Sequence, residues 1–327
     1  MSFKILCFAL ALFSAALYAQ GMLIRLAARF GIGQAIKEYG PEAHFKKAGT
    51  PGMGGLVALA LVPFLLAFSR AIGTAGLREM AYIWAYPVLA AIVGLSDDIL
   101  KLRGRSGDGL KSLQKLFAQI AVTVPWAWLA SSGGVYLMPT LVTSQPYGFA
   151  LLLFLGVGIL NAVNVTDGID GLACGAMMLS LAAAILLSKD GAVRLSSAAG
   201  LALLAAFLWH NSNPAELFMG DVGAHLWGAL LLTVCVQSHF VLFVFPLAFL
   251  FGVEIMTVAI QIFSIRRFGK KVFLMSPIHH HFELRGWREP KIVARFCLAH
   301  AAGMVALLIF LLAILGLYEG AMPDVIQ

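Results

Sequence analysis

Residues 148–188 read GFALLLFLGVGILNAVNVTDGIDGLACGAMMLSLAAAILLS. Two apolar runs, 148–163 and 171–188, flank a short connection that is rich in Asn and Asp. A helix needs about 20 mostly apolar residues, with roughly 17–25 tolerated, to cross the hydrocarbon core of a bilayer. The stretch therefore predicts two membrane-spanning helices joined by a polar turn, and it sets the fold class of the chain.

The rest of the chain has the same character. Of its 327 residues, 61% are hydrophobic and only 12% are charged, and the mean hydropathy is +0.90. A soluble domain carries about 25% charged residues. We therefore predict an all-α integral membrane protein, a polytopic bundle of about ten transmembrane helices that forms a single transmembrane domain over residues 1–327. The predicted spans are 4–26, 52–70, 78–96, 115–131, 148–163, 171–188, 193–209, 222–237, 240–265 and 294–317.

Basic residues are concentrated in alternate connections between these spans. Three connections hold five, five and eight of them, so that 18 of the 23 Lys and Arg residues share one predicted face. By the positive-inside rule this face is cytoplasmic and both termini are extracytoplasmic. Arg25 and Arg29 follow the first apolar run instead of preceding it, which favours a retained first span over a cleaved signal peptide.

Four polar clusters fall on the same predicted face. They are Asp97-Asp98; Asn161, Asn164, Asp167 and Asp170 in one connection; Asn211, Asn213 and Asp221 in the next; and the triplet His279-His280-His281. Carboxylates at helix ends are often merely solvated, and a histidine run can be an affinity tag, but tags are terminal and longer than three residues. Because all four clusters face one side, we predict an active site in the cytoplasmic loops, at the membrane boundary.

The residue types in these clusters suit a magnesium-dependent phosphoryl transfer. Mg²⁺ takes oxygen ligands and is usually held by one or two carboxylates together with substrate phosphates. The remaining acids could orient substrate or act as a base. Asn164, Asp167 and Asp170 recur every three residues, which would place them on one side of a helical turn. Lys47 and Lys115 either anchor their spans at the lipid headgroups or bind a diphosphate-bearing substrate.

Five motifs resemble those of the phospho-N-acetylmuramoyl-pentapeptide transferases, within the wider superfamily of polyprenyl-phosphate N-acetylhexosamine-1-phosphate transferases. In the family's order they are KKAGTP at 46–51, Asp97-Asp98, NAVNVTDGIDG at 161–171, PAELFMGD at 214–221 and PIHHHFE at 277–283. The histidine triplet followed by Phe-Glu-Leu-x-Gly-Trp is specific to the muramoyl-pentapeptide branch. Gly52, Ser96 and Ser276 depart from the residues usual in the family.

The resemblance implies an activity and its partners. Such an enzyme converts UDP-N-acetylmuramoyl-pentapeptide and undecaprenyl phosphate to lipid I and UMP, with Mg²⁺ as cofactor, in the first membrane step of peptidoglycan synthesis. It also implies a homodimer in the bacterial plasma membrane with the active site facing the cytoplasm, and no nucleic-acid partner.

The resemblance also assigns roles to particular residues. Asp221 matches the metal-binding aspartate, with Asn164 beside it, and Asp97 and Asp98 match the pair near the lipid phosphate. Expected at the nucleotide and substrate site are Lys47, Lys101, Lys115, Asn164, Asp167, Asp170, Asn211, Phe218 and Gln261, with Phe218 stacking on uracil. His279, His280 and His281 match a cluster close to the diphosphate or the sugar.

Two alternatives are open at this stage. One is a sibling transferase that uses UDP-N-acetylglucosamine, which assays of both UDP-sugars would separate. The other is a cation-coupled transporter. A transporter would carry its acids near the middle of its spans, whereas Glu254 is the exception among mid-span positions that are almost wholly apolar. We expect Glu254 to be a buried hydrogen-bond partner of a neighbouring helix.

Overall fold

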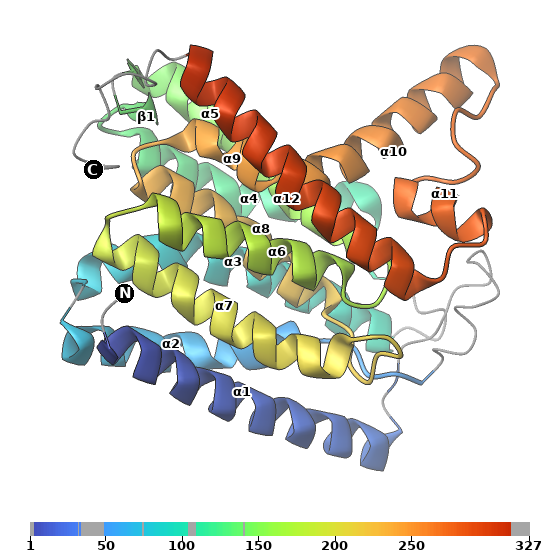
Figure 1. The fold of residues 1–327 in the computed structure, drawn as a ribbon, viewed down its shortest axis with the longest axis horizontal. Helices are drawn as coiled ribbons and strands as arrows, with labels where there is room; N and C mark the ends of the chain where they lie inside the picture. The colour runs from blue at the N-terminus through green and yellow to red at the C-terminus, as the bar shows by residue number, and fades with distance from the viewer. Residues whose placement is uncertain are drawn as a thin grey trace.

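The structure is a computed structural model that describes residues 3–31, 33, 49–73, 75–103, 109–139 and 141–314. Within these residues nine of the ten predicted spans each overlap a single helix (Figure 1). The long helices are α1 Phe3–Phe30, α2 Gly55–Ile72, α3 Leu77–Arg103, α4 Ser112–Ser131, α5 Gln145–Thr166, α6 Leu172–Leu187, α7 Gly191–Asn211, α8 Gly220–Gln237, α10 Phe249–Phe268 and α12 Glu289–Ile314. Seven of them, α1, α2, α3, α5, α7, α10 and α12, are long and apolar enough to cross a membrane. The chain is a multi-pass membrane protein.

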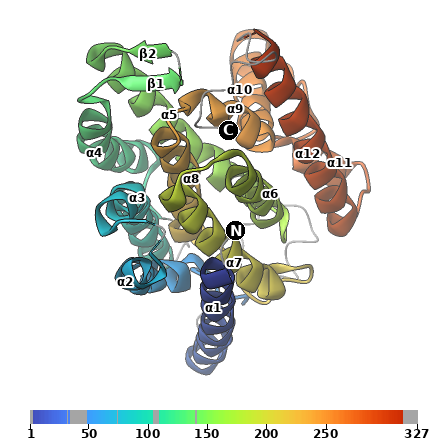
Figure 2. The ribbon, with the colours of Figure 1, turned by 60° about the vertical axis from the view of Figure 1, so that its left-hand side comes forward.

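Helix α8 lies at the centre of the bundle. Figure 2 shows it surrounded by the other helices, and each residue from Asp221 to Cys235 is buried. A helix that is apolar on all sides is stable only when neighbours cover every face. Glycines allow those neighbours to come close: Gly94 of α3 packs on the backbone of Asp221, and Gly55 of α2 packs on Gly223. The first turn of α8 is therefore held between two other helices.

Two local features depart from the predicted all-helical pattern. Strands β1 Val135–Met138 and β2 Leu141–Thr143 form a small antiparallel hairpin, with Val135 opposite Thr143. The predicted continuous span 240–265 is also wrong. It consists of a 3₁₀ turn at Val241–Phe243, the short helix α9 Val244–Leu247 and then α10, with a break at Ala248. Pro246 has no backbone N–H to donate to Leu242 and its ring crowds the turn before it, which fits the 3₁₀ turn that precedes α9.

The break redirects the last part of the chain. Helix α10 leaves the bundle at an angle and crosses α12 (Figure 1). The short helix α11, Ile278–Leu284, follows α10 and precedes α12. In Figure 1, α11 and the hairpin lie at opposite sides of the molecule. The histidine triplet therefore lies far from the hairpin.

The close approach of α3 and α8 is testable with one added methyl group. A Cβ atom at Gly94 would collide with the backbone carbonyl of Asp221, whereas a Cβ atom at Gly158 of α5 meets nothing within 4 Å. Alanine favours a helix over glycine by about 1 kcal/mol, so Gly158→Ala should leave the unfolding temperature in detergent unchanged or raised. Gly94→Ala should lower it, since overpacking costs roughly 1–3 kcal/mol. A Gly94→Ala protein as stable as Gly158→Ala would refute this packing.

Candidate active site

Three buried aspartates meet where α3 ends and α8 begins. Asp97 and Asp98 lie in the last turns of α3, and Asp221 lies in the first turn of α8; each is at most 6% exposed. One carboxylate oxygen from each lies within 4.8 Å of the other two. Asp221 lies inside α8, directly after Gly220. The described residues thus contain one compact acidic cluster, which we call the acidic triad.

Asp98 fixes the start of α8. Its two carboxylate oxygens accept hydrogen bonds from the backbone N–H groups of Asp221 at 3.1 Å and Val222 at 3.0 Å. The first N–H groups of a helix have no partner within the helix, and a carboxylate there also interacts favourably with the helix dipole. Asp98 therefore determines where the side chain of Asp221 lies.

Two lysines neutralise most of the charge of the acidic triad. Lys101 Nζ lies 2.6 Å from Asp97 Oδ2, 3.0 Å from Asp221 Oδ2 and 3.7 Å from Asp98 Oδ1. Lys115 Nζ, from the first turn of α4, lies 2.5 Å from the same oxygen of Asp221. Buried carboxylates without such partners would cost several kcal/mol each. Of the two interpretations of Lys115, a headgroup anchor or a site lysine, the structure shows its ammonium group in the site.

Asn164 completes the ring around Asp221. Its amide Nδ2 donates to Asp221 Oδ1 at 2.7 Å, and its Oδ1 accepts from Lys115 at 3.0 Å. Both carboxylate oxygens of Asp221 therefore have a partner. The triad offers hard oxygen donors of the kind that Mg²⁺ prefers, and an ion bound there would replace one or more of these ammonium and amide contacts. The donor set fits a magnesium ion.

A buried hydrogen-bonded chain behind the acidic triad was missed in the sequence. The Nδ1 of His225 donates to the backbone oxygen of Asp221 at 2.7 Å, so its Nε2 is free to accept from Gln119 Nε2 at 2.9 Å. Asn161 Nδ2 then donates to Gln119 Oε1 at 2.9 Å. The signal was present: His225 follows Asp221, and Gln119 follows Lys115, by four residues, which is one helical turn.

The polar connection between α5 and α6 is not the continuous helical turn that the sequence had predicted. Helix α5 ends at Thr166 and Asp167 caps it, so Asn164, Asp167 and Asp170 do not share one side of a helix. Instead Asp170 Oδ2 accepts hydrogen bonds from Asn213 Nδ2 at 3.0 Å and from the backbone of Ala215 at 3.1 Å. Asn164 points to the acidic triad, and Asp170 fastens the loop between α7 and α8.

Two further predicted residues use their polar atoms to hold loops. Asn211 donates to the backbone oxygen of Leu217 at 2.9 Å and accepts from the N–H of Gly171 at 3.0 Å. Gln261 makes three hydrogen bonds, each of 3.0 Å, to the backbone of Val272 and Phe273. Both side chains are at least 95% buried. In this arrangement they position loops, and their contact with a substrate stays a prediction.

Phe218 lies in the loop just before α8 and is half-buried. Its backbone N–H donates to Pro51 at 2.9 Å, and its carbonyl accepts from Gly54 at 2.8 Å. The motif that begins at Lys46 is thereby tied to the motif that ends at Asp221. Lys47, which was predicted to bind substrate, lies outside the described residues.

The three histidines make three different contacts. His279 is wholly buried, and its Nδ1 lies 3.2 Å from Oε2 of Glu254, a carboxylate of α10 that is also wholly buried. His280 pairs through Nδ1 with Glu283, one turn later in α11. His281 Nδ1 accepts from the backbone N–H of Leu274 at 3.1 Å. The triplet is therefore not a uniform cluster of exposed imidazoles.

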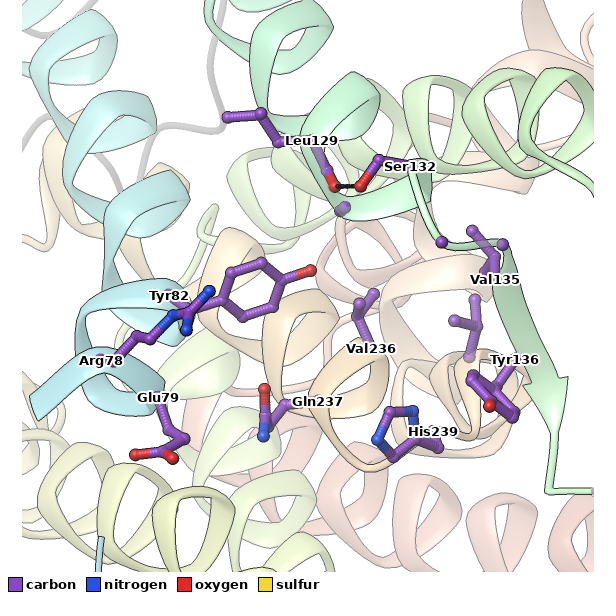
Figure 3. Close-up of a pocket in the computed structure, with 14 residues that line it drawn as sticks. Arg78, Glu79, Tyr82, Leu129, Ser132, Val135, Tyr136, Val236, Gln237 and His239 are labelled. Carbon is purple, nitrogen blue, oxygen red and sulfur yellow. Dashed lines mark hydrogen bonds between the residues drawn. The ribbon is translucent and has the colours of Figure 1, made fainter. Parts of the chain in front are cut away.

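A separate cavity of about 530 Å³ contains none of the predicted site residues. It is lined by the start of α3, the end of α4, strand β1 and the end of α8, and Figure 3 shows Arg78, Tyr82, Gln237 and His239 around it. Helices α3 and α8 have their other ends at the acidic triad. The cavity and the candidate active site therefore lie at opposite ends of these two helices.

Comparison with known proteins agrees with the motifs. The family model described as Glycosyl transferase family 4 matches residues 80–239. The phospho-N-acetylmuramoyl-pentapeptide-transferase of Dictyoglomus thermophilum is 38% identical over 276 residues, which are 83% of this chain and 86% of that protein. The proteins of the same name from Kosmotoga olearia and Caldanaerobacter subterraneus are 35% and 34% identical over 98% and 90% of this chain, and over 100% and 95% of their own lengths. The resemblance seen in the sequence is confirmed, and the chain belongs to the phospho-N-acetylmuramoyl-pentapeptide-transferase family.

Proposed function

We propose that this protein transfers phospho-N-acetylmuramoyl-pentapeptide from UDP-N-acetylmuramoyl-pentapeptide to undecaprenyl phosphate, giving lipid I and UMP. An oxygen of the lipid phosphate bonds to the β-phosphorus of the UDP-sugar, and the bond between that phosphorus and the bridging oxygen breaks. Relatives that carry the name of this transferase align with the chain over most of their length. This similarity supports the muramoyl-pentapeptide substrate over UDP-N-acetylglucosamine, the substrate of a sibling enzyme.

The observation that carries the proposal is the acidic triad with its two lysines at one end of an apolar bundle. A polyprenyl phosphate must keep its tail among apolar helices while its phosphate lies at the headgroup level. Phosphoryl transfer depends mainly on positioning and on stabilising negative charge. Lys101 and Lys115 hold two positive charges where the diphosphate oxygens would lie, beside carboxylates that could hold a metal.

We infer that the metal is Mg²⁺ and that Asp221 is its main ligand, with Asp97, Asp98 and Asn164 around it. Bound there, Mg²⁺ would supply positive charge that stabilises the phosphate oxygens. The substrate roles of Lys47, Asp167, Asp170, Asn211, Phe218 and Gln261 belong to the same proposal. Those that hold loops in the structure would act by shaping the site.

The membrane arrangement is also part of the proposal. Besides the seven helices that meet the length and hydropathy requirement, α4, α6 and α8 would complete ten spans in a homodimeric protein of the bacterial plasma membrane. The distribution of Lys and Arg supports extracytoplasmic termini and an acidic triad that faces the cytoplasm. UDP-linked substrate would then reach the site from the cytoplasm.

Asp221→Asn tests the metal ligand. The substitution keeps the side-chain size but removes the charge, and loss of a catalytic metal ligand costs several kcal/mol of transition-state stabilisation. Lipid I formation at saturating Mg²⁺ should fall below about a tenth of the wild-type rate, while thermal unfolding shows that the protein is still folded. Glu79→Gln, at the opposite end of α3, is the matched control and should keep wild-type turnover. Turnover of Asp221→Asn above that level would contradict the assignment.

Phe218→Ala tests stacking on the uracil. Base–aromatic stacking contributes roughly 1–3 kcal/mol, so UMP and the UDP-sugar should bind about ten-fold more weakly in calorimetric titrations. Phe154→Ala removes an exposed phenylalanine of α5 and should leave both affinities unchanged. Equal affinities of Phe218→Ala and wild type would reject the stacking role.

Single alanine substitutions at His279, His280 and His281 test the triplet. A preorganised hydrogen-bond donor to a developing negative charge contributes about 2.7–4 kcal/mol. At least one of the three substitutions should therefore lower turnover by roughly two decades, with the fold intact by thermal unfolding. Near wild-type turnover in all three proteins would show that the triplet has only a structural function.

A further inference from the structure

Glu254 and His279 form a buried pair to which the proposed reaction assigns no joint role. Glu254 lies in α10 and His279 in the first turn of α11, and both side chains are 0% exposed. The distance from Glu254 Oε2 to His279 Nδ1 is 3.2 Å. A carboxylate and an imidazole that far from water are costly to bury unless they satisfy each other.

Neither group has another polar partner in the part of the chain that the structure describes. In the described residues, neither oxygen of Glu254 and neither ring nitrogen of His279 forms a hydrogen bond. The 3.2 Å contact between Oε2 and Nδ1 lacks the geometry of a hydrogen bond. Buried polar atoms in proteins are almost always hydrogen-bonded. Glu254 Oε2, 3.2 Å away, is therefore the acceptor that the structure offers to a proton on Nδ1.

The other edge of the imidazole faces the turn between α5 and α6. A Cβ atom on Gly168 would collide with Nε2 of His279, so this nitrogen lies directly against the glycine. Gly168 stands between Asp167 and Asp170 in the chain. His279 is thus packed between Glu254 on one side and the turn that follows Asn164 on the other.

We propose that Glu254 is a positioning residue: it accepts the Nδ1 proton of His279 and so presents the Nε2 of this histidine to Gly168, in the turn that follows Asn164, itself a hydrogen-bond partner of Asp221. A carboxylate that holds one nitrogen of a histidine sets both the tautomer and the direction of the other nitrogen. The contact also joins α10 and α11 to the end of α5. Its effect on turnover rests on the proposed function, whereas its effect on the state of His279 does not.

The first test observes the imidazole directly. In ¹⁵N-histidine-labelled protein in detergent, the resonances of His279 are identified as those lost in His279→Gln. We expect Nδ1 to carry a proton in the wild type and in Glu254→Gln, whose amide oxygen still accepts it. In Glu254→Leu the proton should leave Nδ1 or exchange between both nitrogens. An identical Nδ1–H signal in Glu254→Leu and wild type would overturn the proposal.

The second test measures turnover and KM for lipid I formation. Loss of a residue that orients a functional group typically costs 10–100-fold, so Glu254→Leu should lower kcat by roughly that factor with little change in KM. Glu254→Gln should recover most of the loss. Ser180→Ala, which removes the hydrogen-bond partner of Nε2 of the buried His300, is the control for the loss of a polar group beside a buried histidine and should turn over as the wild type does.

The outcomes separate the two proposals. If the wild-type protein releases no UMP from the UDP-sugar, the proposed function fails and the labelled histidine still decides the role of Glu254. If the wild type is active and Glu254→Leu keeps both its kcat and its unfolding temperature, Glu254 positions nothing. Gly168→Ala adds an independent check: its methyl group should displace His279 and lower kcat as Glu254→Leu does.

Discussion

The site depends on the attraction between three buried carboxylates and two ammonium groups. Two unit charges about 5 Å apart interact by about 3 kcal/mol at an effective dielectric constant of 20, so Asp97, Asp98 and Asp221 could not share this volume without Lys101 and Lys115. Counted as fully ionised, the three carboxylates and the two ammonium groups carry a net charge of −1. This small net charge allows the bundle to fold around the acidic triad, and it still attracts a cation to the site.

Backbone packing decides where those charges lie. Gly94 lets α3 approach α8 so closely that the carboxylate of Asp98 reaches the first N–H groups of α8. The cap fixes the first turn of a helix that is buried on every side, and with it Asp221. Lys115 and Asn164 then meet Asp221 from α4 and α5. The apolar core of the bundle thus supplies the rigidity that a preorganised charged site needs.

Much of this could be predicted from the sequence, because membrane spans are local. A run of apolar residues predicts its helix wherever its neighbours lie, so nine of the ten predicted spans matched a helix. Because the polar clusters share one predicted face, the sequence also predicted that Asp97, Asp98 and Asp221 belong to one site. The interruption at Ala248 and the hairpin at Val135 were missed, because hydropathy registers neither a local break in a helix nor the pairing of two short strands.

The sequence did not show which residues of one motif lie in the active site and which hold the loops around it. Asn164 and Asp170 are six residues apart, yet one binds Asp221 and the other binds a loop, because α5 ends between them. Gln261 and Asn211 form their hydrogen bonds with backbone groups of loops. Buried backbone N–H and C=O groups that water cannot reach need such partners. His225 and Gln119 reach the acidic triad from inside helices that hydropathy treats as apolar. Tertiary packing sets the direction of each side chain. That direction decides whether a polar residue points into the active site or holds the surrounding loops in place.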